Sequence, residues 1–160
     1  MTDHVTGPDE GDRADFPVLG NRFLIRSEQT GGRFALIEHT IAPRALGAPT
    51  HTHEREDEYS FVLSGRMGAL LGEEVLEAGP GELIEKPRGI PHAFWNAIDE
   101  ETRLLELISP GGFEQYFIEM APLLNVEGPP DVEAVGEVQQ RYALSMDIGS
   151  HSHADFHECD

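Results

Sequence analysis

The chain has 160 residues, with 30 acidic and 11 basic side chains, so its formal net charge is −19. That charge opposes binding to nucleic acid or to an anionic membrane surface, because both need concentrated positive charge. The one cysteine, Cys159, cannot form an internal disulfide, and no stretch approaches the ~20 apolar residues of a membrane helix. The polar start also lacks the apolar core of a signal peptide. We therefore expect a cytoplasmic protein of one domain.

The chain divides by composition into four segments. Residues 1–15 are acidic and almost without apolar side chains, and we expect a disordered arm. Residues 16–110 contain short runs of β-branched and aromatic residues between turns with Gly or Pro, which is typical of an all-β sandwich or barrel. Residues 111–145 predict two short helices that pack on this domain and cover one of its outer faces. Residues 146–160 form a His-rich tail that we expect to be flexible. The predicted strands cover residues 22–27, 33–41, 50–53, 58–63, 66–71, 74–77, 82–86, 92–96 and 103–109.

A first group of chemically active residues begins at His51. His51 and His53 lie in an extended run, where a period of two places both imidazoles on one face of the strand. Two neutral imidazoles side by side commonly bind a divalent metal. Glu56, Asp57 and Glu58 are rival carboxylates, and spacing alone does not choose among them. Taken alone, the stretch also fits an acidic surface loop with two exposed histidines.

A second group lies between residues 81 and 96, in the run GELIEKPRGIPHAFWN. Together the two stretches resemble the two motifs of the cupin superfamily, G-x5-H-x-H-x(3,4)-E-x6-G and G-x5-P-x-G-x2-H-x3-N. The residues that match are His51, His53, Glu58, Gly65, Gly81, Pro87, Gly89, His92 and Asn96. One position departs from the pattern, because Ala45 stands where the first motif begins with glycine and the nearest glycine is Gly47. This puts the backbone geometry before His51 in question, but not the ligands.

The resemblance implies a fold and a metal. The implied fold is the double-stranded β-helix, a jelly-roll barrel, and the implied ligands of one divalent transition metal are His51, His53, Glu58 and His92. Three imidazoles and one carboxylate suit Fe, Mn, Ni, Cu or Zn. Open positions on such an ion admit water, dioxygen or a substrate. The alternative is a metal-free barrel with residual histidines.

Two further stretches are similar to those of small bacterial quercetin-dioxygenase-like cupins: residues 91–96 (PHAFWN) and residues 109–113 (SPGGF). This similarity implies a mononuclear dioxygenase that acts on a small enolisable, flavonol-like aromatic. It also implies that Glu58 serves both as a ligand and as the catalytic base that takes the substrate proton. The alternatives are a non-catalytic cupin that binds or senses a small molecule and, less favoured, a sugar isomerase or epimerase.

Parity along the strands predicts where several other side chains point. Phe94 shares a face with His92 and is expected to line the pocket, whereas Trp95 points outward and serves packing. We expect Asn96 to fix the neighbouring loop by hydrogen bonding. Of the adjacent Glu38 and His39, one faces the interior, and the sequence does not say which.

Glu58, Ser60 and Val62 share one strand face, and the apolar Tyr59, Phe61 and Leu63 share the other. An apolar outer face needs a cover. The cover is either the C-terminal helices or a second copy of the chain, and we expect a homodimer.

Overall fold

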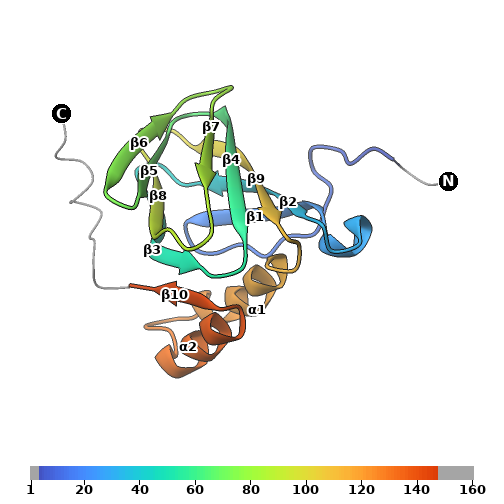
Figure 1. The fold of residues 1–160 in the computed structure, drawn as a ribbon, viewed down its shortest axis with the longest axis vertical. Helices are drawn as coiled ribbons and strands as arrows, with labels where there is room; N and C mark the ends of the chain where they lie inside the picture. The colour runs from blue at the N-terminus through green and yellow to red at the C-terminus, as the bar shows by residue number, and fades with distance from the viewer. Residues whose placement is uncertain (1–3, 148–160) are drawn as a thin grey trace.

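The fold consists of two facing five-stranded antiparallel sheets with a helical hairpin at one open end (Figure 1). The computed structural model describes residues 4–147. The first sheet has the order β1 (Leu19–Ile25), β2 (Ala35–Ile41), β9 (Thr102–Ser109), β4 (Asp57–Ser64), β7 (Leu83–Lys86). The second has the order β10 (Leu144–Met146), β3 (Leu46–His53), β8 (His92–Asn96), β5 (Met67–Leu71), β6 (Glu74–Ala78). The all-β prediction is confirmed, although the sheets remain separate rather than closing into one hydrogen-bonded barrel.

The core lies between the sheets and follows the predicted alternation. In β4, Glu58, Ser60 and Val62 are buried, while Phe61 and Leu63 point outward. One apolar cluster joins both sheets through side chains such as those of Ile41, Val62, Met67 and Leu104. Such two-sided burial is the main apolar contribution to stability, at about 25 cal/mol per Å² removed from water.

Two motif residues fix turns beside the strands. Gly65 has a φ of 84°, and a Cβ there would lie 2.3 Å from Oγ1 of Thr102, so only glycine fits the turn after β4. The buried Asn96 amide donates hydrogen bonds to the carbonyl oxygens of Ile41, Ala42 and Glu100. Its Oδ1 accepts from the Ile98 amide and the Thr102 hydroxyl. The predicted loop-fixing role of Asn96 is thus confirmed.

The chain before His51 continues as a strand despite the missing motif glycine. β3 begins at Leu46, and its pairing with β8 shifts register twice before His51 meets His92. A Cβ on Gly47 would lie 2.2 Å from the Phe94 ring, so a glycine is needed at this position, inside the strand.

The helices form as predicted, but their position corrects the expectation. α1 (Glu114–Leu124) and α2 (Val132–Arg141) lie at the open end of the sandwich, below the sheets in Figure 1. Apolar side chains of both helices pack against Phe23, Ile37 and Ile108 of the first sheet. The outer face of β4 therefore remains exposed to solvent in the single chain. The chain then returns as β10, a short strand that the sequence pattern did not reveal, and pairs with β3.

The N-terminal arm is partly ordered. The backbone amide of Ala14 donates to the carbonyl of Asn21, and that of Phe23 donates to Asp12. The buried Arg22 guanidinium also donates to the carbonyls of Gly7 and Glu10. The expected disorder therefore does not hold for these residues, because β1 offers them backbone and side-chain partners that a composition argument cannot foresee.

Most of the expected tail, from residue 148 onward, lies outside the described residues. Across residues 4–147, the structure contains no helix with the length and apolar character needed to span a bilayer.

Candidate metal centre

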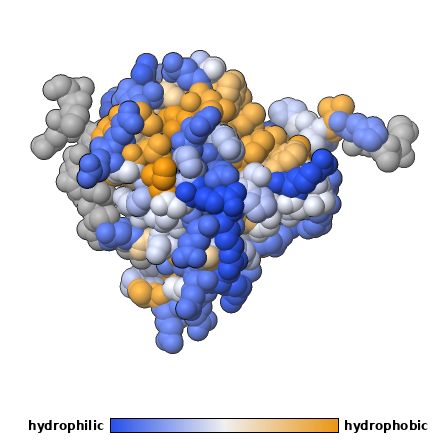
Figure 2. All heavy atoms as spheres, viewed as in Figure 1, coloured by the Kyte–Doolittle hydropathy of each residue, from blue (hydrophilic) through white to orange (hydrophobic). Residues whose placement is uncertain are grey.

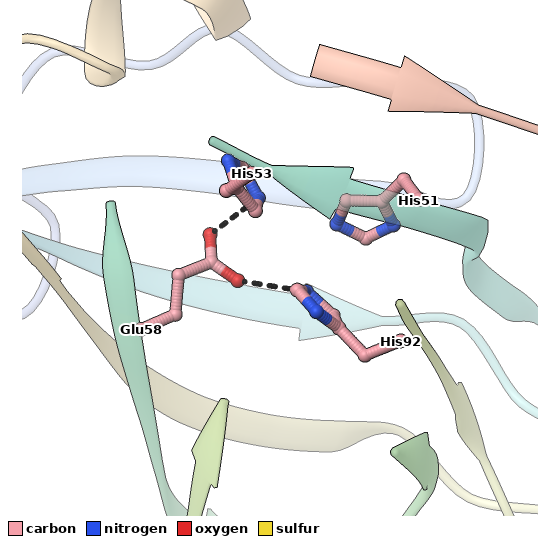
Figure 3. A group of neighbouring side chains, drawn as sticks. All are labelled: His51, His53, Glu58 and His92. Atoms are coloured by element: carbon pink, nitrogen blue, oxygen red, sulfur yellow. Dashed lines mark hydrogen bonds and ion pairs between the residues drawn. The ribbon is translucent and has the colours of Figure 1, made fainter. Parts of the chain in front are cut away.

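Four buried side chains converge between the two sheets (Figure 3). His51 and His53 come from β3, and His92 comes from β8, where it is the register partner of His51. Glu58 reaches them from β4 in the facing sheet. Each side chain offers one ligand atom, and these atoms all lie within 4.8 Å of one another. The predicted set of residues is thus brought together; its role as a metal site stays a prediction.

The outer nitrogens of the imidazoles have partners that orient the rings. Nδ1 of His51 lies 2.8 Å from the Pro49 carbonyl oxygen, and Nδ1 of His92 lies 3.2 Å from that of Ile90. A carbonyl can only accept a hydrogen bond, so the tautomer that carries its proton on Nδ1 satisfies both contacts and would direct each Nε2 lone pair into the cluster.

The three rival carboxylates have three different positions. Asp57 pairs with Arg88 near the surface, with 2.7 Å between Oδ2 and the guanidinium. Glu56 lies behind His53, where its Oε2 is 3.5 Å from Nδ1. Glu58 is inside, with its two oxygens 3.2 Å from Nε2 of His53 and 3.2 Å from Nε2 of His92. Tertiary structure thus makes the choice that spacing left open.

Burial and the Glu58 charge set the electrostatics of the cluster. Burial lowers the pKa of His51 and of His92, so both imidazoles are neutral near pH 7. Burial acts in the same direction on His53, but the carboxylates of Glu58 and Glu56 outweigh it and raise its pKa to about 9. The pKa of Glu58 is far below its usual value because Lys86 and His53 overcome the effect of burial.

The donor set fits a divalent transition metal. Nε2 of His92 lies 3.2 Å from Oε2 of Glu58, so both atoms are close enough to serve as ligands of one cation. Imidazole nitrogen and carboxylate oxygen are the donors that such ions accept. The cluster of four side chains could therefore hold one metal ion.

A second buried polar group, which the sequence reasoning missed, lies beneath the first. Lys86 on β7 is 1% exposed, and its Nζ is 3.0 Å from Oε2 of Glu58 and 2.8 Å from Oε1 of Glu106. The Ser60 hydroxyl donates to Oε2 of Glu106 over 2.5 Å. Burial raises the pKa of Glu106 to about 7. The sequence does carry a signal for this group. Glu106 alternates with the apolar Leu104 and Ile108 along one strand, so it shares their inward face.

Three residues of the cluster, His51, His53 and Glu58, line an apolar cavity of about 290 Å³. The helical hairpin supplies much of the remaining wall, and the ring of Phe113 lies 4.5 Å from that of His53, centroid to centroid. The aromatic lining residues are Phe16, Phe94, Phe113, Tyr116 and Phe117. Among the described residues that line this cavity there is no lysine or arginine.

The structure also shows where the side chains of Phe94, Trp95 and the Glu38–His39 pair point. Phe94 lines the cavity as predicted, and Trp95 packs over Gly68 on the other face of its sheet. His39 is the residue of its pair that faces inward, 6.3 Å from the Phe94 ring. Glu38 is buried on the outer face, where Arg22 and Arg103 neutralise it.

The fold and site define an all-β protein with a His₃Glu cluster beside an apolar cavity. The chain belongs to the cupin superfamily: the cupin domain family matches residues 37–108. It is 36% identical over 101 residues to an uncharacterised protein of Streptomyces coelicolor, spanning 63% of this chain and 89% of that protein.

Two proteins with named activities are also similar. Quercetin 2,3-dioxygenase of Aspergillus japonicus is 31% identical over 103 residues, which are 60% of this chain but only 29% of the enzyme. The polyketide cyclase RemF of Streptomyces resistomycificus superimposes with a TM-score of 0.51 and 34% identity, covering 63% of this chain and 69% of that chain.

Proposed function

We propose that this protein is a metal-dependent oxygenase that uses dioxygen to cleave or oxidise a small, uncharged or enolisable aromatic molecule. The observation that carries the proposal is the contact between the buried His₃Glu cluster and a cavity lined by aromatic rings. A bound divalent ion would supply Lewis acidity and open positions for an oxygen donor and dioxygen.

The protein's own residues would bind and orient the substrate. Phe94, Phe113 and Phe117 offer ring faces and edges for a planar molecule. The helical hairpin forms one side of the cavity and would limit the access of water to a bound substrate. His51, His53, Glu58 and His92 would be the ligands, and the family resemblance adds the role of general base for Glu58.

The names of the two relatives support an aromatic-type substrate, since one acts on quercetin and the other is a cyclase of polyketides. A sugar phosphate fits less well than an aromatic molecule, because phosphates are commonly held by lysine or arginine and the described cavity lining has neither. A sugar-phosphate isomerase is therefore disfavoured.

The direct test is oxygen uptake by protein loaded separately with Fe(II), Mn(II), Ni(II) or Cu(II), with quercetin as the first substrate. Uptake that disappears in His51→Ala, His53→Ala and His92→Ala variants supports the oxygenase. Conversion of an aromatic substrate without oxygen uptake would indicate a redox-neutral enzyme instead. Saturable binding without conversion would indicate the binding or sensing cupin.

We also propose that two copies pair through the outer face of the first sheet. Phe61 and Leu83 are register partners there and are 38% and 50% exposed. Leu105 and Leu107 of β9 lie opposite Phe61 and Tyr59, so the apolar positions are contiguous. Apolar atoms are grouped over the upper β-domain in Figure 2, where β4 and β7 lie toward the viewer in Figure 1. A cytoplasmic location stays a prediction.

A further inference from the structure

Three strands of the first sheet contribute a buried ionic chain that ends on the candidate metal ligand. Glu58 on β4 and Lys86 on β7 are register partners, as are Ser60 on β4 and Glu106 on β9. The ammonium of Lys86 links the two carboxylates, and Ser60 holds the far oxygen of Glu106. All four side chains point between the sheets.

A lysine in this position is costly. Removing an ammonium from water carries a large desolvation cost, and pairing with carboxylates must offset that cost. Lys86 is not among the residues that line the cavity, whereas Phe94 is, and Nζ of Lys86 lies 5.0 Å from the centroid of the Phe94 ring. Lys86 can therefore influence a molecule in the cavity mainly through the carboxylate of Glu58.

The two oxygens of Glu58 have different surroundings. Oε2 is 3.0 Å from the ammonium of Lys86 and 3.2 Å from His92. Oε1 has one close partner among these groups, Nε2 of His53 at 3.2 Å. Each oxygen thus has one imidazole neighbour, and the ammonium of Lys86 is a partner of Oε2 alone.

We propose that Lys86, held in place by Glu106, is a positioning residue that fixes Oε2 of Glu58, so that Glu58 presents Oε1 to the metal as a single-oxygen ligand. This inference rests on the proposed metal centre.

The test uses the full chain and Co(II) alone as the probe, with cobalt affinity and the visible d–d absorption of the bound ion as readouts. Lys86→Met/Glu106→Gln removes one positive and one negative charge together, so the long-range electrostatic effect on a divalent ion largely cancels. Ser60→Ala is the matched control, since it removes a hydrogen bond on Glu106 but keeps the Lys86–Glu58 pair.

We expect the double variant to bind cobalt about 10–100-fold more weakly, as is typical when a partner of a metal ligand is lost. Its d–d absorption should change as Glu58 gains freedom, whereas Ser60→Ala keeps the wild-type spectrum. A folded double variant with unchanged or tighter binding and an unchanged spectrum overturns the inference, because Lys86 would then only neutralise Glu106.

If the double variant does not fold, a crystal structure of the cobalt-loaded wild-type protein decides. Oε1 on the metal with Oε2 on Lys86 supports the inference, and both oxygens on the metal, or Lys86 turned away, overturns it. Failure of the wild-type protein to bind cobalt would instead refute the metal centre itself. The two failures are therefore distinguishable.

Discussion

The ring of Phe113, just before the first turn of α1, stands edge-on to the imidazole of His53, with 4.5 Å between centroids and 78° between planes. Through this contact the helical hairpin reaches the candidate metal centre. β10 adds a second link, since Leu144 is the register partner of His53. The hairpin is therefore a wall of the site rather than a cover for an outer face.

Replacing Phe113 with alanine should weaken both the fold and the site. The side chain is 3% exposed, and Phe→Ala changes in cores cost about 3–5 kcal/mol. Urea unfolding followed by circular dichroism measures this loss. Val132→Ala on α2, at a position 75% exposed, is the control and should change the free energy of unfolding by less than about 0.5 kcal/mol. Equal effects of the two changes would contradict the assigned packing.

Removing one ligand should abolish tight metal binding. We expect His92→Ala to retain far less than one equivalent of metal in elemental analysis after dialysis, because one of four donors is gone. His39→Ala is the matched control: it also removes a buried inward imidazole, but one outside the cluster, so metal content should stay at the wild-type level. Full occupancy in His92→Ala would rule out this site.

His39 should make the metal-free protein less stable in acid. Burial, with a smaller effect of Lys86, lowers the pKa of His39 to about 4. Below pH 6.5 the unfolded chain therefore binds a proton on this imidazole, whereas the folded protein does not bind it until the pH approaches 4. Stability from this group is therefore complete above pH 6.5 and falls as the pH drops toward 4. At pH 5 the loss should be ~2 kcal/mol.

The measurement is the difference in free energy of unfolding between pH 7 and pH 5, with a chelator present, for the wild type and for His39→Leu. Other acid-sensitive groups contribute equally to both proteins, so the variant should lose ~2 kcal/mol less than the wild type. Identical pH dependence would show that His39 is not buried in the neutral form.

The proposed dimer should depend on the outer face of the first sheet. Phe61→Glu combined with Leu83→Glu places two like charges at register-partner positions within the apolar patch and should give monomers in light scattering, because like charges at an interface are costly. Val75→Glu on β6, at an exposed position of the other sheet, should leave the oligomeric state unchanged. A wild-type monomer at high concentration would refute the dimer.

Local sequence determined a large part of this protein. Alternation in β4 determined which of its residues face inward, because strand periodicity acts over a few residues. The resemblance to the two cupin motifs implied the set His51, His53, Glu58 and His92, which the structure brings together. Alternation could not choose between Glu38 and His39. Both proved to be buried, since the charge of Glu38 is neutralised by Arg22 and Arg103 from the two neighbouring strands.

Tertiary structure decided everything that depends on which strands face or adjoin one another. Lys86 and Glu106 are twenty residues apart in sequence, yet their side chains meet because β7 and β9 flank β4 on its two sides. The helices show the same limit: their apolar stripes require a partner surface, but the pattern does not say which one. The open end of the sandwich became that surface because the chain leaves β9 and returns along β3, the strand that carries two of the four candidate ligands.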